Sequence, residues 1–177
     1  MTDSVQPNRA LEQELFDEWP DALRALFDGT ALADKTGFTA SLVTVDANSH
    51  VRTSLLGIGE LYAPDSRTVC IALWPQARAT RALTQSRRAA LTFVFDDAFY
   101  QVQLEFEALG AADDVSGDAG LAYFVGSIDT GEAQRVRYAR LTGGITFELQ
   151  ADREAVLERW EQQVESLKRA AQTAAGR

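Results

Sequence analysis

Apolar residues near the start of the chain recur every three or four positions, as they do on one face of a helix. This first set is Leu11, Leu15, Phe16 and Trp19. Pro20 interrupts the pattern, and because proline is tolerated in a first helical turn, we expect it to open a second helix that stops at Gly29. Residues 1–30 are therefore predicted to form two short helices.

From residue 37 the pattern changes to short runs rich in β-branched residues, separated by turn residues. The predicted strands are residues 38–45, 50–61, 68–74, 89–95 and 99–109. Gly57 and Gly59 mark a bulge or sharp bend in the second run. Short turns join the first three strands, which predicts an antiparallel meander, and residues 77–86 are predicted to form a helix after the third.

The last third of the chain returns mostly to helical patterns. Residues 112–134 are predicted to be largely helical, with Asp129 and Glu132 at the spacing of a capping box. A final hairpin is expected from residues 135–141 and 145–149. Asp152 is a suitable N-cap for a long helix over residues 152–175. Its apolar stripe consists of Leu157, Trp160, Val164, Leu167 and Ala171.

These elements give six or seven strands, mostly consecutive, with helices before, between and after them. Such grouping predicts an α+β barrel or sandwich and argues against a doubly wound parallel sheet. A length of 177 residues favours one domain over the whole chain. Within it we expect helices in 1–30, a barrel with inserted helices in 37–150, and the helix of 152–175.

Composition limits the partners and the cellular location that we expect for this protein. The formal net charge of -9 argues against nucleic acid and anionic membranes as main partners. Cys70 is the single cysteine, so no internal disulfide can form. The first ten residues lack the apolar core of a secretory signal, and no apolar stretch is long enough to span a bilayer. We therefore expect a cytoplasmic protein.

The sequence lacks the residues that several common kinds of binding and catalytic site require. Gly57-Ile58-Gly59 lacks the further glycine of a dinucleotide fingerprint. One cysteine and one histidine, His50, are too few for a zinc site, so no metal is expected. No serine lies in a nucleophile-elbow sequence. Glu105 and Glu107 share one face of a strand, where a solvated surface is a commoner explanation than two-carboxylate catalysis.

A distributed set of residues instead suits a phosphate group. Arg52 is followed by Thr53 and Ser54 on the second strand, and Arg78, Thr80 and Arg81 follow the third strand. Guanidinium groups, hydroxyls and the free N–H groups of a helix N-terminus all bind phosphate. Arginines beside a turn are also commonly a solvated face, so this set of residues is weak evidence when taken alone.

The order of the segments between Phe38 and Leu109 resembles the FMN-binding split-barrel superfamily, to which pyridoxamine 5′-phosphate oxidases belong. The segments are the hairpin around Asp46, Arg52-Thr53-Ser54-Leu55-Leu56, Ile71-Ala72-Leu73-Trp74, Ala77-Arg78-Ala79-Thr80-Arg81-Ala82-Leu83, Arg88-Ala89-Ala90-Leu91-Thr92-Phe93 and Tyr100-Gln101-Val102-Gln103-Leu104. The resemblance implies an antiparallel split β-barrel of six to seven strands with flanking helices and a long C-terminal helix. It also implies a homodimer with the cofactor in a cleft between subunits.

The resemblance gives roles to particular residues. It places Arg52, Arg78, Thr80 and Arg81 at the FMN phosphate, Thr53 to Leu55 along the isoalloxazine, and Gln101 against the flavin ring. Trp74 is either a stacking residue beside the flavin or a buried barrel aromatic. The chain departs from the oxidase at Gly57 and Ala79, where lysines are expected, and it lacks the oxidase's C-terminal arginine–histidine motif. The substrate is therefore expected to differ from pyridoxamine phosphate.

Two classes of function follow. The first is an FMN-dependent oxidoreductase with a small-molecule or nicotinamide redox partner and no assigned catalytic residue. The second is a module that binds flavin or haem without turnover, or a dimeric scaffold that has lost its ligand. A haem would have to use His50 as its axial ligand, and a deazaflavin could replace FMN.

Overall fold

An antiparallel sheet dominates the described part of the chain, residues 11–109, 120–150 and 152–176 of the computed structural model. The strands are β1 (Leu11–Phe16), β2 (Thr39–Val45), β3 (Val51–Gly57), β4 (Leu61–Tyr62), β5 (Thr68–Leu73), β6 (Arg88–Phe95), β7 (Ala98–Leu109) and β8 (Ala122–Val136). The helices are α1 (Asp21–Leu26), α2 (Arg78–Ser86) and α3 (Arg153–Ala175), with 3₁₀ turns η1 (Leu32–Lys35) and η2 (Ile58–Glu60).

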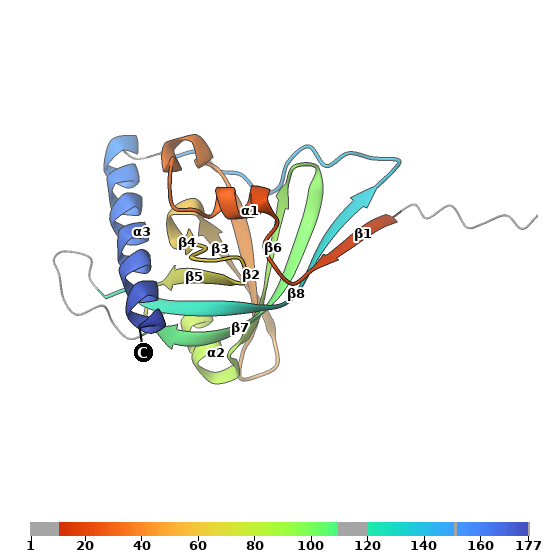
Figure 1. Cartoon of the computed structure of the whole chain (residues 1–177). Helices are drawn as coiled ribbons and strands as arrows, with labels where there is room; N and C mark the ends of the chain where they lie inside the picture. Colours follow the sequence, from red (N-terminus) through yellow and green to blue (C-terminus); the bar gives the residue numbers. More distant parts are fainter. Residues whose placement is uncertain (1–10, 110–119, 151, 177) are drawn as a thin grey trace, which may run out of the picture.

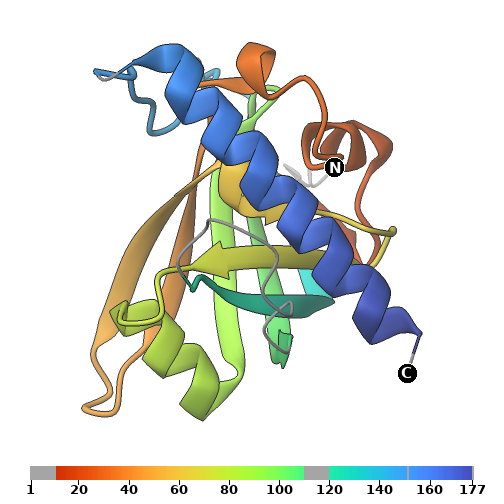
Figure 2. The same cartoon turned by 90° about the vertical axis from the view of Figure 1, so that its left-hand side faces the viewer.

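The strand order is β3-β2-β6-β7-β8-β5-β4. Strand β1 pairs with the C-terminal part of β8, residues 131–136, whereas β5 pairs with its N-terminal part, residues 122–127. Every pair is antiparallel. The sheet curls into a half-barrel, and the long helix α3 crosses one side of it (Figures 1 and 2). The α+β class, the antiparallel barrel and the long C-terminal helix predicted from sequence are confirmed.

Alternation along the strands fills the barrel. Leu42, Leu91 and Val102, on β2, β6 and β7, are fully buried inside it. A second, smaller cluster lies between the sheet and α3, where Leu167 packs near Cys70. Burial, with the nearby Asp65 charge adding to it, raises the pKa of the Cys70 thiol to about 12, so this cysteine is a packing residue and not a reactive thiolate.

The first predicted helix is wrong. Residues 11–16 form strand β1, whose register pairs Leu11 with Val136 and Phe16 with Gly131. Leu15 is 73% exposed, so the helical spacing of the apolar residues does not reflect a buried helical face. Phe16 instead packs against the core over Gly131. The second predicted helix is confirmed as α1, with Pro20 at its N-cap position.

The helical prediction for residues 112–134 is also wrong where it can be compared, because residues 122–136 form β8; residues 112–119 lie outside the described residues. Asp129 is not a helix cap but the extra residue of a bulge, opposite the step from Gln103 to Leu104. A Cβ at Gly126 would lie 2.6 Å from the Phe106 ring, so packing between strands selects this glycine.

Two predicted strand pairings fail. Residues 137–150 contain no strand, so the final hairpin is absent from the described chain. The meander is correct only for β2 and β3, since β5 pairs with β4 and β8 at the other end of the strand order. The bend predicted around Gly57 and Gly59 is confirmed as η2, which separates β3 from β4. Within the described residues the sheet has eight strands, more than the six or seven predicted.

The helix over residues 153–175 begins as the sequence predicts. Asp152 Oδ1 accepts hydrogen bonds from the backbone N–H groups of Glu154 and Ala155, and the predicted apolar stripe lies against the sheet. The helix predicted after the third strand is confirmed as α2. No helix among the described residues is long and apolar enough to cross a membrane.

Candidate functional site

One row of side chains crosses the sheet on the face opposite the barrel core. Its members are directly opposite one another on successive strands: Leu55, Ser41, Thr92, Gln101, Glu132 and Leu15. Each is exposed or half-buried, although its neighbours along the same strand are mostly buried. We call these six residues the outer row and the sheet face that carries them the outer face. In Figure 1, α3 lies against β5 and the start of β8, while β1 and the far half of β8 extend away from it.

The outer row contains two predicted ring contacts, and a third points to the same face. Gln101 and Leu55 belong to it, and Thr53, opposite Val43, points to the same face. From β3 to β7 there are three strand steps of about 4.8 Å, so Leu55 and Gln101 lie about 14 Å apart across the sheet. A flavin mononucleotide, with its three fused rings, ribityl chain and phosphate, is long enough to bridge that span.

The other two predicted residues of β3 point the opposite way. Arg52 is opposite Thr44 and Ser54 is opposite Leu42, and both of these β2 residues are buried on the core side. The predicted set on β3 is therefore divided between two faces, because successive side chains of a strand alternate.

Arg52 is held within the β2–β3 hairpin. Its Nε donates to Asp46 Oδ2 at 2.9 Å, and its Nη2 lies 3.5 Å from His50 Nδ1. Asp46 Oδ1 accepts the backbone N–H groups of Asn48 and His50. The hydrogen bond from Arg52, followed by that from His50 N–H, lowers the pKa of Asp46 to about 2. A phosphate group would have to compete with this carboxylate for Arg52.

The segment from β5 to α2 holds the other predicted residues. Arg78 and Arg81 are exposed, and α2 contacts β2 and β3. Thr80 is buried and its hydroxyl donates to the Trp74 carbonyl at 2.7 Å, so in this structure it fixes the loop before α2. Trp74 is 60% exposed, which excludes the buried barrel aromatic and leaves its side chain open to a ligand.

The sequence reasoning missed a polar cluster around Glu132. Glu132 Oε1 accepts hydrogen bonds from Gln13 Nε2 at 2.5 Å and from Gln134 Nε2 at 2.7 Å. Gln101 lies directly opposite Glu132 on β7. The signal that could have found it is the alternation of Glu132 and Gln134 on one side of a strand. The helical interpretation of this segment hid that alternation.

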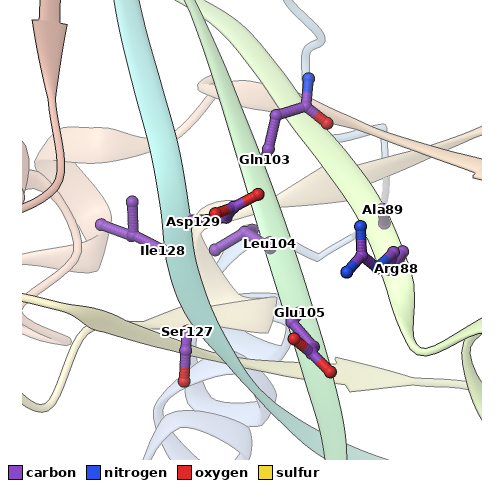
Figure 3. A pocket seen from close by; sticks show the side chains of 8 residues that line it. All are labelled: Arg88, Ala89, Gln103, Leu104, Glu105, Ser127, Ile128 and Asp129. Carbon is purple, nitrogen blue, oxygen red and sulfur yellow. The ribbon is translucent and has the colours of Figure 1, made fainter.

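A pocket of about 270 Å³ opens at the bulge of β8, between β6, β7 and β8 (Figure 3). It is lined by Arg88, Ala89, Gln103, Leu104, Glu105, Ser127, Ile128 and Asp129. Gln103 is two residues along β7 from Gln101, so the pocket adjoins the outer row. The polar lining offers a guanidinium, an amide, a hydroxyl and two carboxylates to a small polar molecule.

The residues present fit a flavin better than a haem. A planar ring can lie on the half-buried centre of the outer face and find amide and carboxylate groups at its edge. His50, in contrast, has a side chain that is 64% exposed beside Asp46 in a hairpin turn, whereas a porphyrin needs apolar surroundings. Within residues 11–109, 120–150 and 152–176, no group of three or more acidic, histidine or cysteine side chains is placed to hold a metal ion.

Comparison with known proteins shows which folds this architecture is similar to. No model of a known protein family matches the sequence. The uncharacterized protein YclD of Bacillus subtilis (strain 168) is 29% identical over 149 residues, which are 84% of this chain and 95% of that protein. Among solved structures, one from Lactobacillus delbrueckii, named for pyridoxamine 5′-phosphate oxidase, has a TM-score of 0.51 at 14% identity over 66% of this chain and 94% of that chain.

The H111A variant of HupZ from Group A Streptococcus has a TM-score of 0.49 at 12% identity, over 64% of this chain and 98% of its own. The likeness to the Lactobacillus protein, at a TM-score of 0.51, is one of overall fold. The chain therefore has the split-barrel fold of the pyridoxamine 5′-phosphate oxidase-like, FMN-binding proteins.

Proposed function

We propose that this protein binds FMN on the outer face of its sheet and is a flavin-dependent oxidoreductase. The observation that carries the proposal is the outer row. It offers a row of side chains with a hydroxyl-bearing centre at Thr92 and Ser41, an apolar end at Leu55, and amide and carboxylate groups at Gln101 and Glu132. Such a surface suits a planar, amphipathic ring.

A second copy of the chain is the partner we propose for this face. Val45, Val51 and Leu55 expose 48, 68 and 55% of their surface close together on the β2–β3 hairpin. Apolar residues gathered on one exposed patch commonly mark an interaction surface. A homodimer through this face would cover them and would leave the ring in a cleft between subunits.

The predicted residues other than Ser54 and Thr80 would then each have a definable task. Arg78 and Arg81, exposed on α2, would bind the phosphate, and Arg52 would join them if the phosphate displaced Asp46. Thr53 and Leu55 would contact the ring face, Gln101 its edge, and Trp74 could stack beside it. Bound flavin supplies the hydride and electron transfer, and the protein supplies binding and orientation. A nicotinamide or another small molecule would be the redox partner.

The first experiment is an absorption spectrum of the purified protein, repeated after addition of FMN and removal of the excess by gel filtration. We expect about one FMN retained per chain, which a nicotinamide donor then reduces. Retention of FMN with negligible turnover would leave a binding module. A protein that retains no flavin would contradict the proposal.

A second experiment tests the phosphate site. Arg78→Ala combined with Arg81→Ala should weaken FMN binding by tenfold or more and leave riboflavin binding nearly unchanged, because only FMN carries the phosphate. Arg137→Ala combined with Arg140→Ala is a matched control, since both arginines are exposed and lie in the coil after β8. Equal losses of FMN and riboflavin would place the phosphate elsewhere.

A further inference from the structure

Glu132 is a carboxylate with one oxygen fixed and the other free of protein partners within the described residues. Oε1 accepts both glutamine amides, while Oε2 makes no hydrogen bond to any described residue. The side chain is half-buried in the middle of the outer face, between Gln101 on β7 and Leu15 on β1. Its position is thus set by the protein, and its free oxygen is available to a ligand on that face.

The side chains beside the Glu132 carboxylate are amides that can donate hydrogen bonds. An ionised carboxylate only accepts hydrogen bonds, so Gln13 and Gln134 must both turn their NH₂ groups toward it, and each NH₂ keeps a second hydrogen. Gln101, whose side-chain amide makes no hydrogen bond to a described residue, lies across the β7–β8 pair, where directly opposite Cβ atoms are about 5 Å apart. The cluster therefore offers a donor, an acceptor and a donor in succession: the Gln101 amide, Glu132 Oε2 and the Gln134 amide.

We propose that Glu132, flanked by Gln101 and Gln134, binds the imide edge of a ring, in which an N–H lies between two carbonyl groups. The carboxylate accepts the ring N–H, and the two amides donate to the carbonyl oxygens. On the proposed function, which this inference requires, the ring is the isoalloxazine and the N–H is at position N3. The hydrogen bond to Glu132 is charge-assisted, which makes it the strongest of the three.

The test compares FMN with FMN methylated at N3, which keeps the phosphate and the ring but loses the donor. Affinities are measured by quenching of flavin fluorescence, and binding of each variant is compared at the same pH and salt. The wild-type protein should bind FMN at least tenfold more tightly than the methylated form, because methylation leaves the Glu132 carboxylate without its partner.

Two variants test whether Glu132 causes the preference for FMN over the methylated form. Glu132→Leu removes the acceptor and should bring the two affinities to within about twofold of each other. Glu132→Gln keeps the shape and the contacts to Gln13 and Gln134 but removes the charge, and should reduce the preference by several-fold with an unchanged melting temperature. Glu105→Gln is the matched control, because it removes one negative charge from the same face and should keep the wild-type preference.

The outcomes separate the two proposals. Equal binding of FMN and N3-methyl FMN by the wild-type protein would overturn the role of Glu132 while leaving flavin binding intact. A preference that persists in Glu132→Leu would overturn it as well. Failure of the wild-type protein to bind FMN, riboflavin or the methylated form would overturn the proposed function and this inference together.

Discussion

At the scale of single residues, the β2–β3 turn makes a prediction about Asp46. Its pKa is lowered from 3.8 to about 2, first by the hydrogen bond from Arg52. Arg52→Ala should therefore raise the pKa of Asp46 toward its ordinary value. Because the folded pKa is below the unfolded one, Asp46 stabilises the fold above pH 3.8, and this contribution is lost as the pH falls toward 2. Carboxyl NMR titration measures the midpoint directly.

Arg67→Ala is the control for this prediction, since Arg67 pairs with Asp17 and Glu18 and not with Asp46. It should leave the Asp46 midpoint unchanged. If Asp46 still titrates near 2 in Arg52→Ala, then the backbone N–H groups of Asn48 and His50 are sufficient to hold its pKa down, and Arg52 is freer to bind a phosphate than the hairpin geometry suggests.

Glu60 makes the opposite prediction. Burial raises its pKa, against the opposing effects of the Gly57 N–H and the charge of Arg159. The folded protein therefore holds the Glu60 proton more tightly than the unfolded chain does. Stability should fall as the pH rises above the ordinary value of 4.5, until the raised folded pKa is passed. Glu60→Gln, which keeps an acceptor for Gly57 N–H, should remove this decline.

Urea unfolding of the wild-type protein, Glu60→Gln and Glu158→Gln over a series of pH values from about 4 to 8 checks the sign. Glu158 is exposed on α3, so its variant should follow the wild-type curve. A wild-type protein whose stability relative to Glu60→Gln does not change over this range would show that Glu60 keeps an ordinary pKa.

At the scale of elements, the packing of Phe16 on Gly131 attaches β1 to β8. A Cβ at Gly131 would overlap the Phe16 ring. Gly131→Ala should therefore destabilise the fold by about 1–3 kcal/mol, the usual cost of an overpacked site. Gly143→Ala is the control, because nothing lies within 4 Å of a Cβ there and its φ is not positive. The measurement is the free energy of unfolding in urea.

A double-mutant cycle identifies the contact. In a Phe16→Ala background, Gly131→Ala should cost much less, because the ring that the new methyl group would meet is gone. Equal costs in the two backgrounds would mean that the strain arises elsewhere on β8.

The same elements show how far sequence reasoning reaches. The strands β2, β6 and β7 and the helix α3 were predictable, because their periodicity agrees with the face they bury. Strand β8 was not. Gly126 and Gly131 interrupt its apolar alternation, because aromatic rings on the neighbouring strands occupy the space that a side chain would need. These contacts join residues far apart in the sequence, so the local sequence pattern does not reveal them. The same limit applies to the candidate site: the sequence led to Gln101, on the predicted strand β7, but not to Glu132, on the missed strand β8.

The order of the strands in the sheet is a second feature that the sequence did not predict. The sequence predicted that β3 lies beside β5, whereas four strands separate them in the strand order. Local turns determine which strands form hairpins, but the closing of β5 onto β8 depends on contacts distant in sequence. The prediction that α2 lies near the β2–β3 hairpin is nevertheless correct, because α2 contacts both strands.

At the scale of the whole molecule, the last prediction concerns the partner on the outer face. Leu55 is 55% exposed in the single chain, and a second copy packed there would bury it. An unpaired charge buried in such an interface costs several kcal/mol, so Leu55→Asp should weaken dimerisation by about 100-fold or more. Analytical ultracentrifugation over a range of concentrations should find a dimeric wild-type protein and a largely monomeric variant.

Ile145→Asp is the matched control, because Ile145 is 54% exposed but lies in the coil after β8 and not in the β2–β3 hairpin. It should remain dimeric. If the cleft between subunits also holds the flavin, Leu55→Asp should release FMN as it dissociates, and Ile145→Asp should retain it. A Leu55→Asp variant that is monomeric yet retains FMN would mean that one chain suffices for binding. Dissociation by both variants would mean that the interface extends beyond the β2–β3 hairpin.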